Sequence, residues 1–220
     1  MNNLYKYPRT PHFPFSRSKT SDDKTLDTVD HFVGKHVIAS LKIDGENTSM
    51  YRDYFHARSL DSRHHISRNF VKGLWGNIRY QIPDGWRICG ENMYAKHSIY
   101  YTELPSFFIV FAVFDNKNVC LSWDETISFC LERGLETVPV LYQGIWDGER
   151  VKACMTGKQY FGGEQEGVVV RLADSFPYED FHNCTGKMVR QGHVQTSDFW
   201  ANQPIIPNKL KGAKDELREL

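Results

Sequence analysis

The sequence predicts an α+β fold in which mainly antiparallel strands pack as two sheets with flanking helices. Three observations favour this class. Strand-like runs recur along most of the chain, clear helical patterns are few, and the strands do not alternate with helices as in a doubly wound parallel sheet. With 220 residues the chain can bury a sizeable core, and we expect one main domain.

The predicted strands are short apolar or alternating segments bounded by polar and turn residues. The second and third strands are close enough in sequence to form a hairpin across Asp53 and Tyr54. In chain order the strands are expected at residues 37–41, 48–52, 55–59, 86–92, 107–114, 138–142 and 166–172.

Two helices are better marked than any other. Residues 67–80 carry large apolar side chains at helical spacing. Residues 122–133 open with Ser122 and Glu125 in a capping box and end before a glycine. A weaker pattern predicts a third helix over residues 147–156.

The two ends of the chain differ from its centre. Residues 1–30 are polar, rich in proline and serine and weakly periodic, so we expect an extended arm packed on the domain. Residues 31–200 contain all the predicted strands and form that domain. Residues 201–220 end in KLKGAKDELREL, which predicts a solvated helical tail.

The composition argues against several classes of protein. Lys and Arg number 27 and Asp and Glu also number 27, so a polyanion site requires a local concentration of basic side chains. The five cysteines lack CxxC spacing, which argues against a disulfide framework and a zinc site. The start lacks an apolar signal core and the longest apolar run is short, so we expect a cytoplasmic protein without membrane contact.

A lysine at the end of the first predicted strand is the leading candidate for chemistry. Lys42, Asp44 and Gly45 form a KxDG pattern directly after residues 37–41. Residues two apart on an extended chain share a face, and glycine permits a close approach, so the pattern can place an amine in a cleft. Taken alone, KxDG also fits an edge-strand lysine followed by an ordinary Asp-Gly turn, so it decides little.

The motifs that follow, in order, change this interpretation. They are Arg58 in HARS, Glu91 in CGEN, the aromatic run at 107–114, Glu166 in EGVVVR and Lys187 in GKMVR. With this order and spacing the chain resembles the covalent nucleotidyltransferase superfamily of polynucleotide ligases and RNA capping enzymes. KIDGENTSMYRD, HARSLDSRHH and GKMVRQGHVQT are most similar to its ATP-dependent RNA ligase branch, and the resemblance runs from about residue 5 to residue 200.

The resemblance implies an ATP-grasp-like adenylation domain and a reaction in three steps. Lys42 would take AMP from ATP as a phosphoramide, AMP would pass to an RNA 5′-phosphate, and an RNA 3′-hydroxyl would displace it. The implied cofactors are ATP and Mg²⁺ or Mn²⁺, and the implied partner is RNA; a protein partner stays open. Relatives usually carry a second domain, but with 20 residues after Trp200 we expect no separate OB-type domain.

The first step sets a requirement for the lysine. An attacking amine must be unprotonated, whereas the pKa of a free lysine is about 10.4. We therefore expect desolvation, Lys187 and a bound magnesium to lower the pKa of Lys42. The same cations would neutralise charge on the phosphoryl oxygens and on departing pyrophosphate. Lys42 and Lys187 are thus the expected catalytic residues.

The resemblance also assigns contacts with the nucleotide. Glu91 would accept a hydrogen bond from a ribose hydroxyl, Arg58 would meet a phosphate or ribose, and Glu166 would help hold magnesium or the surroundings of Lys42. Asn47 stands where DNA ligases and capping enzymes have arginine, and we interpret it as an amide that contacts the nucleotide or the RNA 5′-phosphate. The expected nucleotide-binding residues are Leu41, Lys42, Ile43, Asp44, Asn47, Arg58, Glu91, Phe111, Glu166 and Lys187.

Two phenylalanines compete as the aromatic that stacks on adenine. Phe111 lies 20 residues after Glu91, in the strand where the family places this aromatic. Simple alternation puts Phe111 on one face with Phe107, Ile109 and Val113, which also fits a plain core strand, and puts Phe114 on the opposite face.

Candidate RNA contacts lie in two basic segments. Arg63 and Arg68 belong to the basic stretch 56–72, and residues 6–19 interleave basic with aromatic side chains, although a solvated loop and a loose terminus fit these segments equally well. Arg190 replaces the second lysine of the family's last motif, but its odd spacing from Lys187 predicts that it points to the opposite face.

Other activities remain open at the level of sequence. A DNA-nick ligase or a capping guanylyltransferase would use the same motifs, and the nucleotide that labels the protein would distinguish the capping enzyme. A non-catalytic RNA-binding module on the same fold is a further alternative, and it has no need of Lys42, Glu91, Glu166 and Lys187 together.

Overall fold

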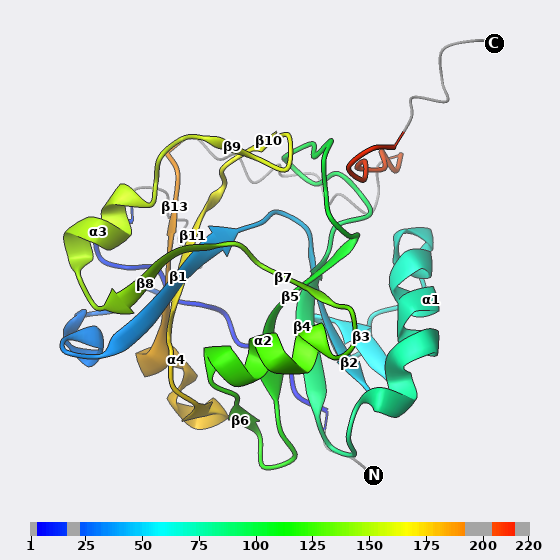
Figure 1. Cartoon of the computed structure of the whole chain (residues 1–220), viewed down its shortest axis with the longest axis horizontal. Coiled ribbons are helices and arrows are strands. Elements are labelled where there is room, and N and C mark those ends of the chain that lie inside the picture. Colours follow the sequence, from blue (N-terminus) through cyan, green and yellow to red (C-terminus); the bar gives the residue numbers. More distant parts are fainter. Residues whose placement is uncertain (1–3, 17–22, 192–203, 214–220) are drawn as a thin grey trace.

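The structure, a computed structural model, describes residues 4–16, 23–191 and 204–213 and confirms the α+β class. Figure 1 shows two strand layers: β1, β8, β11 and β13 lie on the left and β2 to β5 and β7 on the right. Almost every strand pairing is antiparallel, and β5 with β7 is the parallel exception among the described pairs.

The first sheet has four strands in the order β13-β11-β1-β8. Side chains alternate along these strands, so Val168 and Val170 of β11 enter a buried core while Val169 and Arg171 line a cavity on the other face. The bounds are His36–Lys42 for β1, Val140–Ile145 for β8, Gly167–Leu172 for β11 and Thr185–Val189 for β13.

The second sheet has seven strands, in the order β12-β6-β5-β4-β2-β3 with β7 beside β5. Its β2 and β3 form the predicted hairpin, with Thr48 opposite Ala57. The bounds are Glu46–Tyr51 for β2, Phe55–Ala57 for β3, Arg87–Asn92 for β4, Phe108–Phe114 for β5, Val119–Cys120 for β6, Glu136–Thr137 for β7 and Phe176–Pro177 for β12. Strands β9 (Gln159–Tyr160) and β10 (Gly163–Glu164) form a separate pair.

Helices cover the outer faces, and the two that were best marked in the sequence are both present. In α2 the Ser122 hydroxyl accepts the Glu125 N–H and the Glu125 carboxylate accepts the Ser122 N–H, which confirms the capping box. The third predicted helix is present but shorter than expected. The α-helices are α1 Asn69–Ile78, α2 Trp123–Leu131, α3 Gly148–Ala153 and α4 Phe181–Cys184; 3-10 turns occur at Asp30–Phe32, Ile66–Arg68, Arg79–Gln81 and Tyr178–Asp180.

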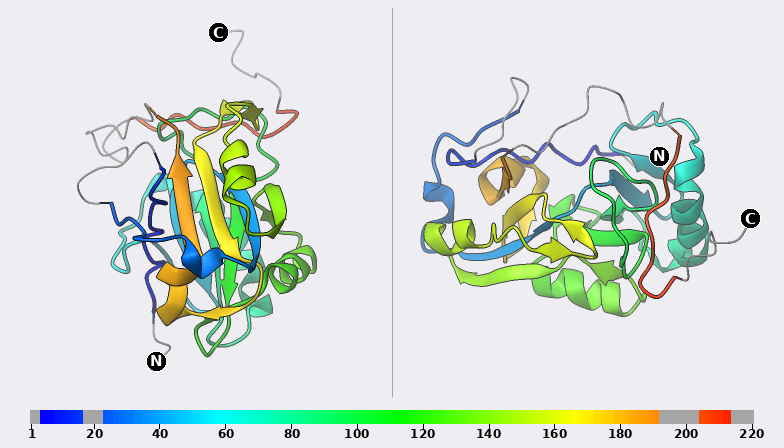
Figure 2. Two further views of the ribbon diagram at one scale, coloured as in Figure 1. Left: turned by 90° about the vertical axis from the view of Figure 1, so that its left-hand side faces the viewer. Right: turned by 90° about the horizontal axis from the view of Figure 1, so that it is seen from above.

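The N-terminal arm is more deeply built into the domain than its composition suggests. The Phe13 N–H donates to the Lys187 carbonyl at 2.8 Å, and the Lys187 N–H donates to the Pro11 carbonyl at 2.8 Å, so the arm runs along β13 (Figure 2). Phe13 is fully buried, and its ring lies 5.5 Å from that of Phe32 and 5.4 Å from that of Trp146. The arm therefore closes the core on that side of the sheet.

The prediction of a helical tail is wrong for residues 204–213: residues 204–210 run extended beside the segment 94–104, and a turn follows at 211–212. Two prolines, Pro204 and Pro207, disfavour a helix there. The Asn208 amide also ties the extended backbone down, because it donates to the Met93 carbonyl at 2.8 Å and accepts the Tyr101 N–H at 2.9 Å. The remaining residues of the predicted tail lie outside the described residues.

Two further features bear on the sequence-based expectations. The five cysteines are all described, and each is buried with a free thiol. Among the described residues, no helix combines the length and apolar character that crossing a membrane requires.

The packing of the arm on β13 generates a stability prediction. A methyl group on Gly186 would lie 2.5 Å from the ring of buried Phe13, so Gly186→Ala is expected to destabilise the fold by about 1–3 kcal/mol through overpacking. Gly76→Ala in α1 is the matched control, because nothing lies within 4 Å of the added methyl and alanine favours a helix by about 0.5–1 kcal/mol. Urea unfolding measures both; a Gly186→Ala protein as stable as the unmodified chain would contradict this packing.

Candidate active site

A cavity of about 580 Å³ lies between the two sheets. Its walls come from β1, β11 and β13 on one side and from β2, β4 and β5 on the other, and the N-terminal arm closes a third side. This volume falls within the range of about 300–1,000 Å³ that is usual for small-molecule sites. The expected nucleotide-binding residues line it, with the exception of Asp44.

Strand pairing brings Lys42 to Glu166. Lys42 is the last residue of β1, and its Cα lies opposite that of Gly167, the first residue of β11. Glu166 therefore sits beside the lysine, and the Lys42 Nζ donates to Glu166 Oε1 at 2.5 Å. The Glu166 side chain is 5% exposed and that of Lys42 is 25% exposed, so the pair is shielded from water on the carboxylate side.

The charge state of Lys42 differs from the expectation. Burial lowers its pKa, but Glu166, followed by Glu91 and Asp44, raises it, and the net pKa is above the ordinary value. The prediction that neighbours lower this pKa is therefore wrong for the ligand-free protein, because the carboxylates outweigh desolvation. In this state the chain holds Lys42 as an ammonium ion.

Lys187 approaches the same cavity from β13. Its Cα lies opposite that of Val169, whose side chain lines the cavity from β11. Burial and then the nearby Lys42 lower the pKa of Lys187, while Asp23 and Glu166 act in the opposite direction. The two expected catalytic lysines thus face one cavity and repel each other's charge.

Glu91 and Asn47 face the cavity from adjacent strands of the second sheet. Their Cα atoms are direct partners in the pairing of β2 with β4. Burial, opposed by Lys42, raises the pKa of Glu91 to about 8, so this carboxyl is mostly protonated at neutral pH in the ligand-free protein. The Asn47 Oδ1 is buried without a hydrogen-bond partner. Both groups suit a polar ligand with hydroxyl groups.

A bulge in β5 decides how the competing aromatics point. The register of β4 with β5 shifts between Cys89 and Gly90, so Phe111 is left out of the pairing and the alternation changes there. Phe111 lines the cavity, whereas Phe114 packs deeper, with the Arg87 guanidinium 3.9 Å from its ring centre. The prediction that Val113 shares the face of Phe111 is wrong, since Val113 packs in the opposite core with Phe108.

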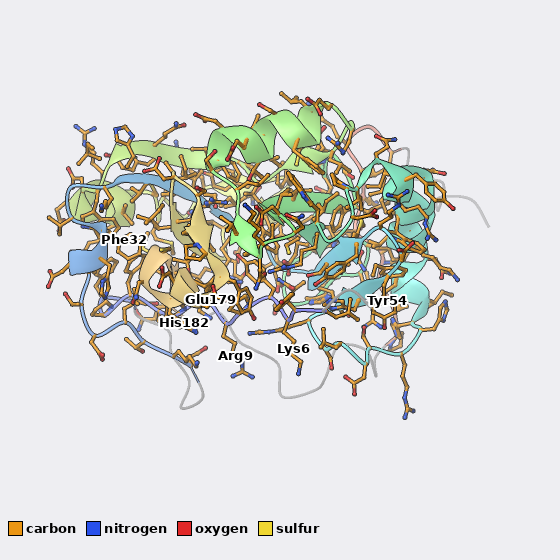
Figure 3. The ribbon with its side chains drawn as sticks, turned by 90° about the horizontal axis from the view of Figure 1, so that it is seen from below. Lys6, Arg9, Phe32, Tyr54, Glu179 and His182 are labelled. Atoms are coloured by element: carbon orange, nitrogen blue, oxygen red, sulfur yellow. The ribbon has the colours of Figure 1, made fainter. Side chains whose placement is uncertain are left out.

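Arg58 is the expected phosphate ligand that meets the cavity from the loop after β3. Burial and then Arg9 lower its pKa, so two guanidinium groups approach each other at the cavity edge. Figure 3 shows Lys6 and Arg9 along the arm, both pointing outward from the body of the protein. This edge offers basic side chains to a polyanion.

Four expected ligands lie outside the cavity. The Asp44 carboxylate accepts the N–H groups of Ser98 at 2.7 Å and Ile99 at 2.9 Å, so it anchors a loop. Arg68 forms a bidentate ion pair with Glu46, and Arg190 lies 2.6 Å from Glu164.

Arg68 is thus paired with Glu46 in the ligand-free protein, and its RNA contact stays a prediction. Arg190 is likewise paired with a carboxylate, and it does not line the cavity. Arg63 is exposed beside Arg68 and does not line the cavity.

Several residues that line the cavity were not singled out in the sequence. The arm contributes Tyr7, Arg9, His12, Asp23 and Lys24, and β11 contributes Arg171. The ring of Tyr7 lies 4.8 Å from that of Phe111 in an edge-on arrangement, so the arm also braces the aromatic wall. The interleaved basic and aromatic residues of the arm were the available signal, but sequence gives no register for such a segment.

The cavity fits a nucleotide and one divalent cation bound with it. The buried Asn47 Oδ1 lacks a partner, the Phe111 ring is partly exposed, and Lys42, Arg58 and Lys187 supply cationic groups. Among the described residues, no group of three or more His, Cys, Asp and Glu side chains could hold a metal alone. Magnesium commonly uses one or two carboxylates together with substrate phosphates, and Glu166 fits that arrangement.

Comparisons with known proteins identify one family for this chain. The sequence model of the RNA ligase family matches residues 35–189, which include every motif from Lys42 to Lys187. No curated protein matches the chain.

Among solved structures, a Naegleria gruberi RNA ligase with pyrophosphate is similar at a TM-score of 0.56 and 14% identity, covering 89% of this chain and 64% of that one. A mutant of the same ligase with AMP and manganese gives 0.55 and 16% identity, covering 85% and 62%. A candidate ATP-dependent DNA ligase from Aquifex aeolicus gives 0.55 and 19% identity, covering 84% and 50%.

These likenesses concern the fold, and the chain spans less than two thirds of the length of each of these structures. The family assignment rests on the match of the family model, which extends over more than half of the chain. The chain belongs to the RNA ligase family.

Proposed function

We propose that the chain is an ATP-dependent RNA ligase that carries AMP on Lys42, passes it to an RNA 5′-phosphate and joins that end to a 3′-hydroxyl. One observation carries the proposal: the Lys42 Nζ shares a nucleotide-sized cavity with Glu91, Glu166 and Lys187, and these four residues come from separate places in the chain. A core or surface role does not require these four ionisable groups to converge.

In the first step the Lys42 nitrogen attacks the α-phosphorus of ATP. The N–P bond forms, the P–O bond to the β-phosphate breaks, and pyrophosphate departs with the electron pair. Two protons leave the nitrogen on the way from ammonium to phosphoramide, and Glu166 Oε1, 2.5 Å away, is the nearest acceptor in the ligand-free protein. Disruption of this ion pair is thus part of activation.

The cavity's cations stabilise the charge that moves in this step. Lys187 and Arg58 face the phosphates, and Glu166 would hold Mg²⁺ or Mn²⁺ jointly with them. The metal would supply charge neutralisation at the phosphoryl oxygens. The Naegleria gruberi structures with ATP or AMP also contain manganese, which supports a divalent cation here.

The remaining side chains bind and orient the nucleotide. Phe111 stacks on adenine, Glu91 and Asn47 meet the ribose hydroxyls, and Leu41 and Ile43 shape the floor around Lys42. In the second step an oxygen of the RNA 5′-phosphate attacks the phosphorus of the bound AMP, the N–P bond breaks and the Lys42 amine leaves. In the third step the RNA 3′-hydroxyl attacks the 5′-phosphorus, loses its proton and displaces AMP. Arg58 and Arg9, which meet at the cavity edge, are basic groups that an incoming strand end could contact.

We further propose that residues 31–200, together with the arm, form the adenylation domain. Five buried free thiols suit a reducing compartment, so we place the protein in the cytoplasm.

The first prediction is an AMP adduct on Lys42. Incubation of the protein with labelled ATP and a divalent metal should give acid-stable label, and GTP should give none. Lys42→Ala should lose the label because the nucleophile is gone, while Lys72→Ala on exposed α1 should retain it. Peptide mass spectrometry locates the adduct; label from GTP alone would instead support a capping enzyme, and RNA binding without any adduct would support the non-catalytic module.

The second prediction concerns pH. The pKa of Lys42 is raised, so below it the unprotonated fraction grows about tenfold per pH unit, and adenylylation at subsaturating ATP should rise from pH 6 to pH 9. Subsaturating ATP is chosen because the rate then reports the ionisation of the free enzyme. A flat profile in single-turnover measurements of this step would rule out the proposed ionisation.

A further inference from the structure

The arm places a carboxylate next to Lys187. The Lys187 Nζ donates to Asp23 Oδ1 at 3.5 Å, and both side chains are 17% exposed. His12 approaches the other oxygen of the same carboxylate, with Nε2 3.4 Å from Asp23 Oδ2, and it is almost fully buried. Asp23 thus lies between a buried imidazole and a cavity lysine.

A hydroxyl lies behind His12. The Ser16 Oγ accepts the Val189 N–H at 3.3 Å and lies 2.8 Å from His12 Nδ1. Because the Asp23 carboxylate only accepts hydrogen bonds, His12 has to present a hydrogen on Nε2; in the neutral ring Nδ1 is then the acceptor, and the Ser16 hydroxyl donates to it. The chain of contacts starts on β13 at Val189, passes through the arm and returns to β13 at Lys187.

The backbone holds this arrangement in register. The His12 N–H donates to the Lys24 carbonyl at 2.7 Å, and the Leu26 N–H donates to the His12 carbonyl at 2.8 Å. His12 also forms isolated parallel β-bridges with both Thr25 and Lys187. The two halves of the arm are therefore fixed to each other and to β13, which positions Asp23 by main-chain contacts as well as by side chains.

We propose that Asp23 and His12 are positioning residues for Lys187: Asp23 anchors the Lys187 ammonium on the cavity wall, and His12, held by Ser16, orients the Asp23 carboxylate. This role rests on the proposed function, because Lys187 is taken there to face the nucleotide phosphates. It makes the N-terminal arm a part of the AMP-transfer machinery.

The charges around Lys187 give the anchor a second effect. The charged groups that face it among the described residues are Lys42 of β1, Glu166 before β11 and Asp23 of the arm, with His12 behind Asp23. Lys42 disfavours the Lys187 ammonium, and Asp23 and Glu166 favour it. Loss of the Asp23 charge should therefore leave Lys187 easier to deprotonate.

The test compares Asp23→Asn with Asp27→Asn, a control at an exposed arm position away from the cavity. Competitive acetylation of the nucleotide-free proteins across pH, read by peptide mass spectrometry, reports the ionisation of Lys187. In Asp23→Asn the half-labelling pH of Lys187 should fall by about one unit. Single-turnover adenylylation at saturating ATP should slow about tenfold, as for loss of one charge-assisted contact. The control should match the unmodified protein in both assays.

Two substitutions of His12 test whether its N–H donor matters for the rate of adenylylation. His12→Ala should slow adenylylation, and His12→Gln should recover most of the rate because its amide keeps an N–H donor for Asp23; thermal unfolding of each variant identifies simple loss of fold. An unchanged labelling pH of Lys187 in Asp23→Asn, or an adduct formed at the normal rate, overturns the proposal. If the unmodified protein forms no adduct, the proposed function fails, and the acetylation assay still decides whether Asp23 anchors Lys187.

Discussion

The antiparallel pairing of β1 with β11 is the constraint on which the site depends. It sets Lys42 opposite Gly167 and so brings the Glu166 carboxylate to 2.5 Å from the lysine nitrogen. A side chain at position 167 would overlap the Met188 carbonyl, so glycine there lets β13 lie close and deliver Lys187 to the same cavity. One register thus positions both lysines and the carboxylate.

The resulting charges favour the protonated form of Lys42 in the ligand-free protein. Two neighbouring lysines would repel in a shielded site, and Glu166 and Asp23 each supply a carboxylate that compensates one of them. Lys42 consequently rests as an ammonium ion, and in the proposed reaction the binding of a polyanionic nucleotide would redistribute these pairs before attack. Glu91, with its pKa of about 8, adds little negative charge at neutral pH and leaves this balance to the two ion pairs.

Sequence alone located the parts of the site that belong to regular strands. Lys42 at a strand end and Glu166 at the start of another could be predicted because apolar runs mark strands, whereas Lys187 was singled out by its motif alone, since the strand around it, β13, was not among the predicted strands. The bulge at Phe111 was not visible, since one unpaired residue leaves no compositional trace. The contacts of the predicted arm were also missed, because those of His12 and Asp23 depend on a long-range register. The ion pairs of Arg68 and Arg190 depend on which carboxylates lie nearby in space.

The most direct test of this account is an NMR titration of the Lys42 side-chain nitrogen in the nucleotide-free protein. The Lys42 signal is assigned by its loss in Lys42→Arg, and the titration is repeated in Glu166→Gln. The account predicts a Lys42 pKa above the ordinary lysine value of about 10.4, falling when the Glu166 charge is removed. A Lys42 pKa below the ordinary value, or one unaffected by Glu166→Gln, would contradict the claim that this carboxylate holds the nucleophile in its charged form.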